Sequence, residues 1–217
     1  LKNKKYAIVG NSGCGKSTIV KLLLNYYDNY KGNILINDVN HNEIDMSSVY
    51  SHLSMVHQNA PILNDTLRNN ITYYNDYSME QVNQIVHEAG LDHFVESLPD
   101  GLDTVINENG NNISGGEKQR ISIARTLLKK PKILIFDDST SAVDTSTEAK
   151  IRKVLMKDMK DTTKIIISQR ILSIKDADKI VVLDNGKING IGTHKELMEN
   201  NEIYREIYLS QQNGLME

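Results

Sequence analysis

A glycine-rich stretch, GNSGCGKST at residues 10–18, combines the residue types that hold phosphate groups. Its glycines allow successive backbone N–H groups to converge on phosphate oxygens at the start of a helix, where the helix dipole favours negative charge. Lys16 is spaced to reach the β and γ phosphates of a nucleotide, and the Ser17 hydroxyl is spaced to ligate Mg²⁺. The alternative, a glycine-rich turn with a surface lysine, leaves the flanking apolar strand and helix unexplained. The nucleotide-binding residues predicted by this pattern are Asn11, Ser12, Gly13, Cys14, Gly15, Lys16, Ser17 and Thr18.

Two adjacent aspartates follow an apolar run in ILIFDD, residues 133–138. An Mg²⁺ ion on a nucleotide needs a carboxylate opposite Ser17, and an acidic residue at the tip of a neighbouring strand supplies it. We therefore predict Asp137 as a metal ligand. Asp138, one residue further, is placed to orient or polarise an attacking water; the alternative is that it caps the turn or helix that follows.

Short apolar runs of four to six residues indicate the strands that position these groups. They lie at residues 6–9, 33–36, 52–56, 132–136, 164–168 and 179–183. The last three are nearly continuous in apolar and β-branched residues, as expected for parallel strands covered on both faces by helices. Capping patterns indicate helix starts between the strands, at residues 78–81, 145–148 and 193–196. The predicted fold class is therefore α/β with a mostly parallel sheet.

One region departs from the alternation of strand and helix. Between residues 59 and 130 the apolar residues fall at helical spacing, with no good strand among them, and Pro61, Pro99 and Pro131 punctuate the region. We predict an ATP-binding core formed by residues 1–58 and 131–217, with a helical lobe inserted at residues 59–130.

Composition narrows the class of protein further. The chain has 217 residues, of which 39% are apolar, and its net charge of −3 gives no broad basic field for nucleic acid. Cys14 is the only cysteine, which excludes a disulfide within the chain and fits a reducing compartment. No apolar run reaches the roughly 20 residues that cross a bilayer. We therefore predict a globular domain without nucleic acid as a partner and without a spanning segment of its own.

A further motif, NISGGEKQR at residues 112–120, resembles the LSGGQ signature of ATP-binding cassette (ABC) proteins. It is joined by Gln58, which resembles the family's Q-loop glutamine, by SAVD at residues 141–144, which resembles the D-loop, and by SQR at residues 168–170, where the family has its switch histidine. The order and spacing of these motifs agree with the family along essentially the whole chain. The resemblance implies a P-loop NTPase (RecA-like) core with an inserted helical signature subdomain.

The resemblance also implies that ATP and Mg²⁺ are bound between two such domains arranged head to tail. One chain's phosphate loop would be completed by the other chain's signature residues, which here are Ser114, Gly115, Gly116 and Glu117. Their N–H groups precede a helix and can form a second cradle for the γ phosphate. An ordinary helix start would explain the serine but not the paired glycines. By resemblance, Gln58 would ligate the metal and take part in catalysis.

Two departures from the family pattern bear on hydrolysis. The family normally has Glu where this chain has Asp138, and His where it has Gln169. Asp138 is one methylene shorter, and a misplacement of roughly 1 Å can cost about a hundredfold in rate. Gln169 can donate an amide hydrogen bond but cannot carry the charge of an imidazolium. We therefore predict that this chain is the degenerate half of a heterodimeric exporter, whose partner chain carries Glu and His.

The last 40 residues resemble the ends of multidrug-type exporter ATPase domains from low-GC bacteria, at residues 177–186, 192–197 and 203–211. This implies a place on the cytoplasmic face of a bacterial cell membrane, with transmembrane domains as partners. Importers and lipid or peptide exporters stay open. So do a regulatory module that only clamps the dimer and a soluble cassette protein that acts on nucleic acid or ribosomes.

The family stacks adenine on an aromatic residue a couple of dozen positions before the phosphate loop, which here begins at Gly10. We therefore expect further strands and a membrane region upstream of the sequence. By family resemblance, coupling to the membrane region would fall on residues 59–70 and 107–110.

Overall fold

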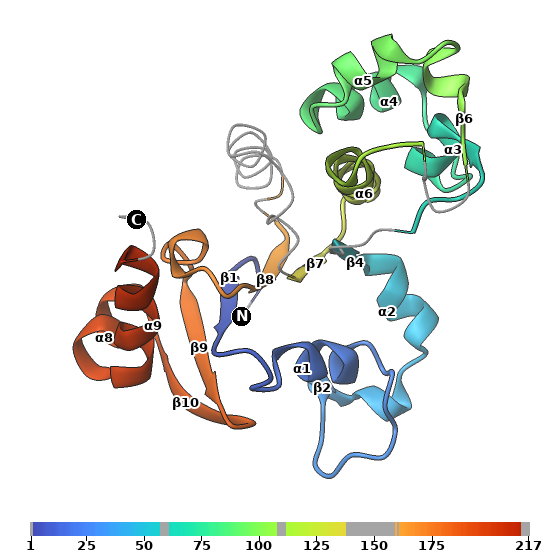
Figure 1. Cartoon of the computed structure of the whole chain (residues 1–217). Helices are drawn as coiled ribbons and strands as arrows, with labels where there is room; N and C mark the ends of the chain where they lie inside the picture. Colours follow the sequence, from blue (N-terminus) through green and yellow to red (C-terminus); the bar gives the residue numbers. More distant parts are fainter. Residues whose placement is uncertain (1, 57–60, 108–111, 138–158, 160, 214–217) are drawn as a thin grey trace. The chain divides into compact units, whose positions relative to one another are not determined.

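The computed structural model describes residues 2–56, 61–107, 112–137, 159 and 161–213 (Figure 1). The chain divides into two compact units. Unit 1 consists of Leu1–Leu53, Ile133–Asp137 and Thr163–Glu217, and unit 2 consists of Ser54–Lys132 and Asp138–Thr162. The strand β4 (Leu53–Val56) begins at the last residue of the first segment of unit 1.

Unit 1 is built on a twisted sheet in which β10, β9, β1, β8 and β7 lie side by side in this order. These strands are β1 (Lys5–Val9), β7 (Ile133–Asp137), β8 (Thr163–Ile167), β9 (Lys179–Asp184) and β10 (Lys187–Gly192). β1 pairs parallel with both β8 and β9, β8 pairs parallel with β7, and only β10 runs antiparallel, along β9. The predicted α/β class with a mostly parallel sheet is confirmed.

Four of the predicted strands, at residues 6–9, 132–136, 164–168 and 179–183, correspond to β1, β7, β8 and β9 within one residue at each end. The run at 52–56 forms β4 one residue later, because His52 ends the preceding helix. The run at 33–36 is wrong in extent: only β2 (Leu35–Ile36) forms, paired with β3 (Val39–Asn40) in a two-stranded ladder.

Strand β10 was not anticipated, although the chain carries its signal. Asn185 and Gly186 connect β9 to β10 with φ values of 47° and 75°. Two successive positive φ values are those of the type I′ turn, for which Asn-Gly is the favoured pair in hairpins. A register shift between Ile188 and Gly190 interrupts the alternation of β10, which explains why no apolar period marked it.

The helices of unit 1 cover the sheet on two sides (Figure 1). α8 and α9 lie against one face, and α1 lies on the other side of the sheet. The helices of the unit are α1 (Lys16–Leu23), α2 (Met46–His52), α8 (His194–Asn200) and α9 (Glu202–Asn213), with short 3₁₀ turns η1 (His41–Glu43) and η4 (Ile171–Ser173). The predicted capping pattern at residues 193–196 is confirmed: Thr193 and Glu196 form a reciprocal capping box at the start of α8.

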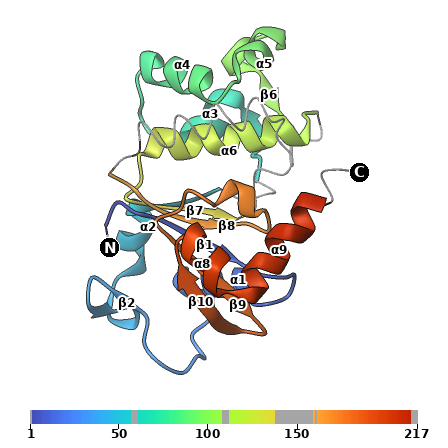
Figure 2. The ribbon, with the colours of Figure 1, turned by 90° about the vertical axis from the view of Figure 1, so that its left-hand side faces the viewer.

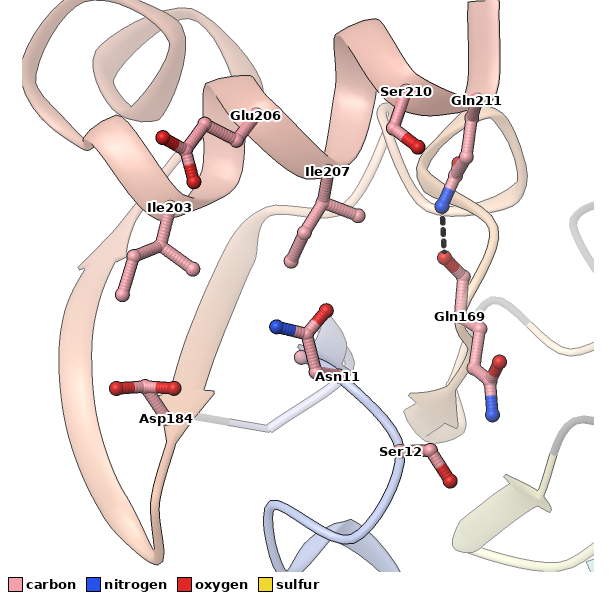
Figure 3. Close-up of a pocket in the computed structure, with 10 residues that line it drawn as sticks. Asn11, Ser12, Gln169, Asp184, Ile203, Glu206, Ile207, Ser210 and Gln211 are labelled. Atoms are coloured by element: carbon pink, nitrogen blue, oxygen red, sulfur yellow. Dashed lines mark hydrogen bonds between the residues drawn. The ribbon is translucent and has the colours of Figure 1, made fainter. Parts of the chain in front are cut away.

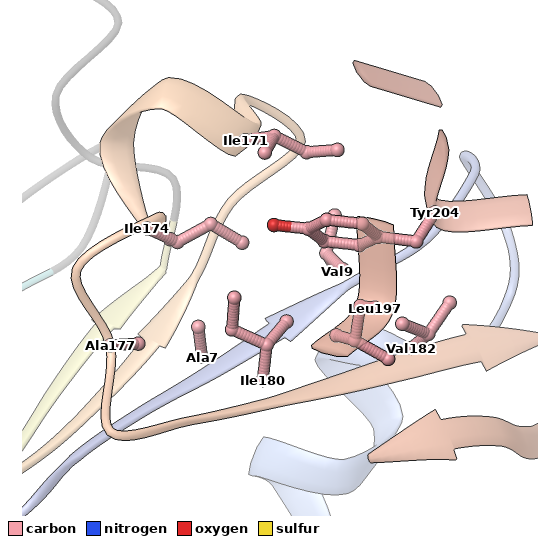
Figure 4. Packing of buried hydrophobic residues seen from close by; sticks show 9 residues of the cluster. All are labelled: Ala7, Val9, Ile171, Ile174, Ala177, Ile180, Val182, Leu197 and Tyr204. Atoms are coloured by element: carbon pink, nitrogen blue, oxygen red, sulfur yellow. The ribbon is translucent and has the colours of Figure 1, made fainter. Parts of the chain in front are cut away.

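The core of unit 1 lies between the sheet and α8 and α9 (Figure 4). It consists of Ala7, Val9, Ile171, Ile174, Ala177, Ile180, Val182, Leu197 and Tyr204. Tyr204 has no exposed surface, and its hydroxyl hydrogen bonds to His194 Nδ1 at 2.8 Å, because a buried phenol needs a polar partner. Burial raises the pKa of the Tyr204 hydroxyl. Tyr204 therefore fixes α9 on the sheet.

Unit 2 is mainly helical, as predicted, and α3 and α4 pack on the long helix α6 (Figures 1 and 2). Its helices are α3 (Leu67–Thr72), α4 (Met79–Glu88), α5 (Asp92–Ser97) and α6 (Gly115–Lys129), with the 3₁₀ turn η2 (Gly101–Asp103). The predicted box at residues 78–81 opens α4, where Ser78 and Gln81 cap each other. No helix in the described part of the chain is long and apolar enough to cross a membrane.

The expectation that this region holds no strand is wrong in one place. β5 (Asp65–Thr66) pairs antiparallel with β6 (Val105–Ile106), two residues on each side. Pairs this short leave no periodic pattern in the sequence, and the two strands are separated by a chain segment that forms three helices.

A polar network holds the start of unit 2 together. Asn70 is fully buried; its Oδ1 accepts from Leu63 N at 2.8 Å, and its Nδ2 donates to Leu63 O at 3.0 Å. Arg125 of α6 donates to Asn70 O and, at 2.6 Å, to Pro61 O, and its guanidinium stacks over the Tyr73 ring at 4.5 Å. Asn70 is therefore a structural residue, and its side chain cannot contribute to a coupling surface at 59–70.

The start of β1 is fixed by a carboxylate. Asp178 Oδ2 accepts from Lys5 N at 2.8 Å and Asp178 Oδ1 from Lys4 Nζ at 3.2 Å. The bond from Lys5 N, helped by the charge of Lys4, lowers the pKa of Asp178 below its ordinary value of 3.8. A carboxyl whose pKa is lowered by folding stabilises the folded state above its ordinary pKa, and this contribution is lost as the pH falls through the folded value.

We expect Asp178→Asn to lower the free energy of unfolding by about 1 kcal/mol at pH 7, because a charge-assisted bond becomes a neutral one on a partly exposed side chain. The difference from wild type should shrink as the pH is lowered from 5 toward 2. Urea unfolding followed by circular dichroism measures both. Asp28→Asn, at an exposed position, is the matched control; an equal loss in the two variants would contradict the assigned role.

Candidate functional site

The glycine-rich loop leaves β1 at Val9 and ends where α1 begins at Lys16. Gly15 caps the helix with φ 104° and Gly13 has φ 78°, both in the left-handed region that disfavours other residues. At Gly10 the reason for glycine is space: an added Cβ would lie 2.2 Å from Leu183 O and 2.7 Å from Cys14 Sγ. The loop therefore passes directly against the backbone of β9.

Lys16 folds back along this loop and is almost completely buried. Its Nζ donates to Gly10 O at 2.8 Å and to Asn11 O at 2.9 Å. Cys14 is buried as well, and its carbonyl accepts from Gly186 N at 3.2 Å. The other predicted residues of the loop and first helical turn are exposed or half-exposed: Asn11, Ser12, Gly13, Gly15, Ser17 and Thr18. The loop thus carries one positive charge inside a curve of backbone, with polar groups facing solvent.

Parallel pairing brings Asp137, a further predicted residue, to the edge of the sheet from which this loop starts. Asp137 is level with Ile167 of β8, and Ile167 is level with Ile8 of β1. Asp137 therefore lies two strands from β1, about 10 Å away, just short of the start of the loop. Asp137 and the loop that leads to Ser17 thus start from one edge of the sheet of unit 1.

The hydroxyl and carboxylate oxygens of Ser17 and Asp137 fit Mg²⁺, which prefers hard oxygen donors and keeps several ligands from water and nucleotide phosphates. Among the described residues no group of three or more His, Cys, Asp or Glu could hold a metal ion alone. The two oxygen donors suit a cation that brings phosphate and water ligands of its own.

Gln169 follows β8, the strand between β1 and β7. Ser168, which is buried, donates its N–H to Ile8 O at 3.3 Å, and its Oγ accepts from Arg170 N at 2.9 Å. These bonds hold the backbone around Gln169 at the end of the sheet, while the Gln169 side chain is exposed. The structure therefore places Gln169 beside the glycine-rich loop.

A cavity of about 460 Å³ opens between this loop and α9 (Figure 3). It is lined by Gly10, Asn11, Ser12, Gln169, Asp184, Ile203, Glu206, Ile207, Ser210 and Gln211. The contribution of α9 was missed at the sequence level. The lining residues of α9 recur every three to four positions, which indicates that they share one face of a helix. This spacing does not predict which strands that face packs against.

The signature residues lie in unit 2, at the start of α6. Ser114 is the N-cap; its Oγ accepts from Glu117 N at 3.3 Å, and its own N–H donates to Glu117 Oε2 at 2.6 Å. Ser114 and Gly115 are exposed and Gly116 is half-exposed. An added Cβ at Gly115 would meet nothing within 4 Å. Glu117 thus completes a capping box with Ser114, and the two glycines that follow Ser114 remain at least half-exposed.

Several predicted residues lie outside the described residues. They are Gln58, Asp138, the D-loop-like residues 141–144, the capping pattern at 145–148 and part of the expected coupling surface, at 59–60 and 108–110.

Comparison with known proteins places this loop, this sheet and this helical lobe in one class. A family model described as ABC transporter matches residues 2–141. The chain belongs to the ABC transporter family, and its fold is that of the family's ATP-binding domain, an ABC-type ATPase.

Individual relatives are similar along nearly the whole chain. The ATP-dependent lipid A-core flippase of Mannheimia succiniciproducens is 43% identical over 97% of this chain and 36% of its own length. The mitochondrial iron-sulfur clusters transporter atm1 of Aspergillus fumigatus is 40% identical over 98% of this chain and 30% of its own length. A solved bacterial Atm1-family ABC exporter with ATP bound has a TM-score of 0.91 at 40% identity, over 97% of this chain and 37% of that one. The chain therefore spans about a third of the length of these relatives.

We expect Gly10→Ala to weaken ATP binding by about tenfold or more, because the new methyl group displaces the loop from Leu183 and overpacking of this kind costs about 1–3 kcal/mol. Calorimetric titration with ATP measures the loss. Gly32→Ala is the matched control: Gly32 also has a left-handed φ, of 104°, but an added Cβ there meets nothing within 4 Å. Equal affinities for the two variants would refute the steric argument.

Proposed function

We propose that this chain is the ATP-binding and ATP-hydrolysing domain of an ABC exporter, and that it powers transport across a membrane. The observation that carries the proposal is the buried Lys16 ammonium inside a curve of backbone at the start of α1. A fixed positive charge and a helix N-terminus together favour a bound phosphate chain. The similarity to ABC exporters over nearly all of the chain supports the choice of class.

In this proposal the N–H groups of residues 11–16 bind the β phosphate and Lys16 bridges the β and γ phosphates. Lys16 Nζ already lies in the loop at hydrogen-bond distance from Gly10 O and Asn11 O, so it needs only a short movement to exchange a carbonyl for a phosphate oxygen. That exchange replaces a neutral acceptor by a charged one, which strengthens the bond.

Ser17 and Asp137 would hold Mg²⁺ from two sides, with Gln58 as a further ligand. When bound, the metal neutralises charge that develops on the phosphates during transfer. Asp138 would orient the attacking water, and Gln169 would donate its side-chain amide to the γ phosphate. The positions of Ser17, Asp137 and Gln169 at one edge of the sheet support these roles.

A second ABC ATPase domain would complete each site in a head-to-tail dimer. Ser114, Gly115 and Gly116 of one chain would approach the γ phosphate held by the other, with Glu117 keeping Ser114 in place. Their exposure at the start of α6 supports this arrangement. Transmembrane domains would be the other partners, at the cytoplasmic face of a bacterial cell membrane, with no nucleic acid involved.

We further propose that the chain's own site hydrolyses slowly and that its partner in a heterodimer carries the faster site. The support is chemical: Asp138 is one methylene shorter than glutamate, and the amide of Gln169 cannot take up a proton. The second candidate function is a regulatory module that binds ATP and only clamps the dimer. The names of the relatives also keep a lipid exporter open. A peptide exporter stays open as well, because by family resemblance the membrane segments select the cargo.

We expect Lys16→Ala to weaken binding of ATP by about a hundredfold or more, since charge-assisted hydrogen bonds to two phosphates contribute about 1.5–3 kcal/mol each. Calorimetric titration at fixed salt measures the affinity. Lys21→Ala, at an exposed position in the last turn of α1, is the control that removes the same charge. Unchanged affinity in the Lys16 variant would overturn the proposed phosphate site.

We expect Asp138→Glu to raise the rate of ATP hydrolysis by about tenfold to a hundredfold, because the longer side chain returns the carboxylate to the water. The rate is followed by phosphate release at saturating MgATP, with Asp137→Glu as the control that lengthens the neighbouring carboxylate. Combination with Gln169→His should raise the rate again.

A wild-type rate equal to that of the Asp138→Glu variant would refute the slow site. A rate that stays at background in both variants, with ATP still bound, would favour the clamp module.

A further inference from the structure

The carboxamide of Gln211 in α9 holds the backbone around Gln169. Gln211 Nε2 donates to Gln169 O at 2.5 Å, and Gln211 Oε1 accepts from Ile171 N at 2.9 Å (Figure 3). The two bonds use both ends of one planar amide and span three consecutive residues of the main chain. A side chain thus pairs with the loop after β8 as a neighbouring strand would.

The anchor of this contact is rigid. α9 is fixed to the core of unit 1 by Tyr204, which is fully buried, and by Ile207, which packs against the same cluster. Gln211 lies four residues after Ile207 and therefore on the same face of the helix, toward the sheet. The position of the Gln211 amide is set by the core and not by the loop that it holds.

Gln211 and Ser168 hold the loop from two sides. Ser168 Oγ accepts from Arg170 N at 2.9 Å. The Gln211 amide donates to the carbonyl of Gln169 and accepts from the N–H of Ile171. Bonds to Gln169 O and Ile171 N–H hold the two peptide planes that follow Gln169 and so restrict the direction in which its side chain leaves the backbone. In Figure 3 the Gln169 carbonyl points to Gln211, and its side-chain amide points away from α9.

We propose that Gln211 is a positioning residue that holds Gln169 in reach of the γ phosphate, so that α9 sets the geometry of the switch position. The inference rests on the proposed function, because Gln169 needs a phosphate to act on. Gln211 makes hydrogen bonds to the Gln169 loop but is not bonded to any residue of the glycine-rich loop. Its loss should therefore act on turnover at saturation and not on the affinity for ATP.

The first measurement is amide hydrogen exchange by NMR on the folded chain. Gln211→Ala should speed exchange at Ile171 N–H by about tenfold, since its acceptor is removed. Exchange at Ala177 N–H, which is bonded to Ile174 O at 2.9 Å in the same segment, should stay unchanged. Gln212→Ala is the matched control, because Gln212 is the next residue of α9 and its side-chain amide donates to Tyr208 Oη of the same helix.

The second measurement is ATP turnover with the same variants. We expect Gln211→Ala to lower kcat by about five- to tenfold with KM unchanged, on the scale of one lost hydrogen bond and a small displacement. Gln211→Glu keeps the acceptor for Ile171 N–H but has no donor for Gln169 O, so it should retain slow exchange and still lose turnover. Gln212→Ala should resemble the wild type in both measurements.

A double-mutant cycle separates positioning from general stability. In a Gln169→Ala background the Gln211→Ala change should have almost no further effect on kcat, because the group that it positions is gone. Additive losses, or equal kcat in the Gln211→Ala and Gln212→Ala variants, would overturn the inference. If the wild type binds ATP without hydrolysing it, the proposed hydrolytic function fails and the clamp module is favoured. Unchanged exchange at Ile171 in Gln211→Ala would overturn the positioning contact independently.

Discussion

The parallel register of β1, β8 and β7 is the constraint on which the candidate site depends. Parallel strands end at the same edge of a sheet. A loop after one strand and a carboxylate at the end of another are therefore brought together by the backbone pairing itself. Here Ile8, Ile167 and Asp137 lie at one level, and the residues that follow them in β1 and β8 lead into the glycine-rich loop and into Gln169. A register change of one residue in β8 would turn its side chains to the other face and displace Gln169 along the edge.

Within this sheet edge the backbone sets the shape of the proposed phosphate site. Gly10 approaches Leu183 more closely than any side chain would allow, and Lys16 lies inside the curve that the loop forms. One departure from the family pattern, Gln169, lies at this edge of the sheet. A glutamine at position 169 is neutral at every physiological pH, so any switch that it provides works through geometry alone. The direction of its side chain therefore depends on the groups that hold its backbone, which in unit 1 are Ser168 and Gln211 of α9.

Much of this arrangement follows from local patterns. The strand, the glycines and the lysine of residues 6–18 form one continuous signal, and the apolar runs at β7, β8 and β9 mark buried parallel strands within a residue of their observed ends. The capping boxes at Ser78 and Thr193 were predictable because each needs only two residues at fixed spacing. The fold class and the order of the site residues were predictable for the same reason.

What could not be predicted depends on contacts between distant residues. The β5 and β6 pair has two residues on each side, which is too short to show a period in the sequence. Asn70 is a polar residue of a type usually found at the surface, and its burial depends on hydrogen bonds to Leu63 and Arg125. The cavity-lining residues of α9 recur at helical spacing in the sequence. Only the fold, however, brings Gln211 to Gln169, 42 positions away. The Asn185–Gly186 pair carries the turn signal for β10, but the register shift between Ile188 and Gly190 interrupts the alternation that would mark the strand.

The tight turn between β9 and β10 has a consequence for how this domain can diverge. Gly186 N is bonded to Cys14 O, so the tip of the hairpin supports the phosphate loop from beneath, while Ile188 and Ile191 further along β10 face solvent. Insertions at residues 185–186 would pull this support away from the loop, whereas substitutions on the outer side of β10 leave it in place. Homologous domains should therefore conserve the length of this hairpin far more strictly than the residues along its outer edge.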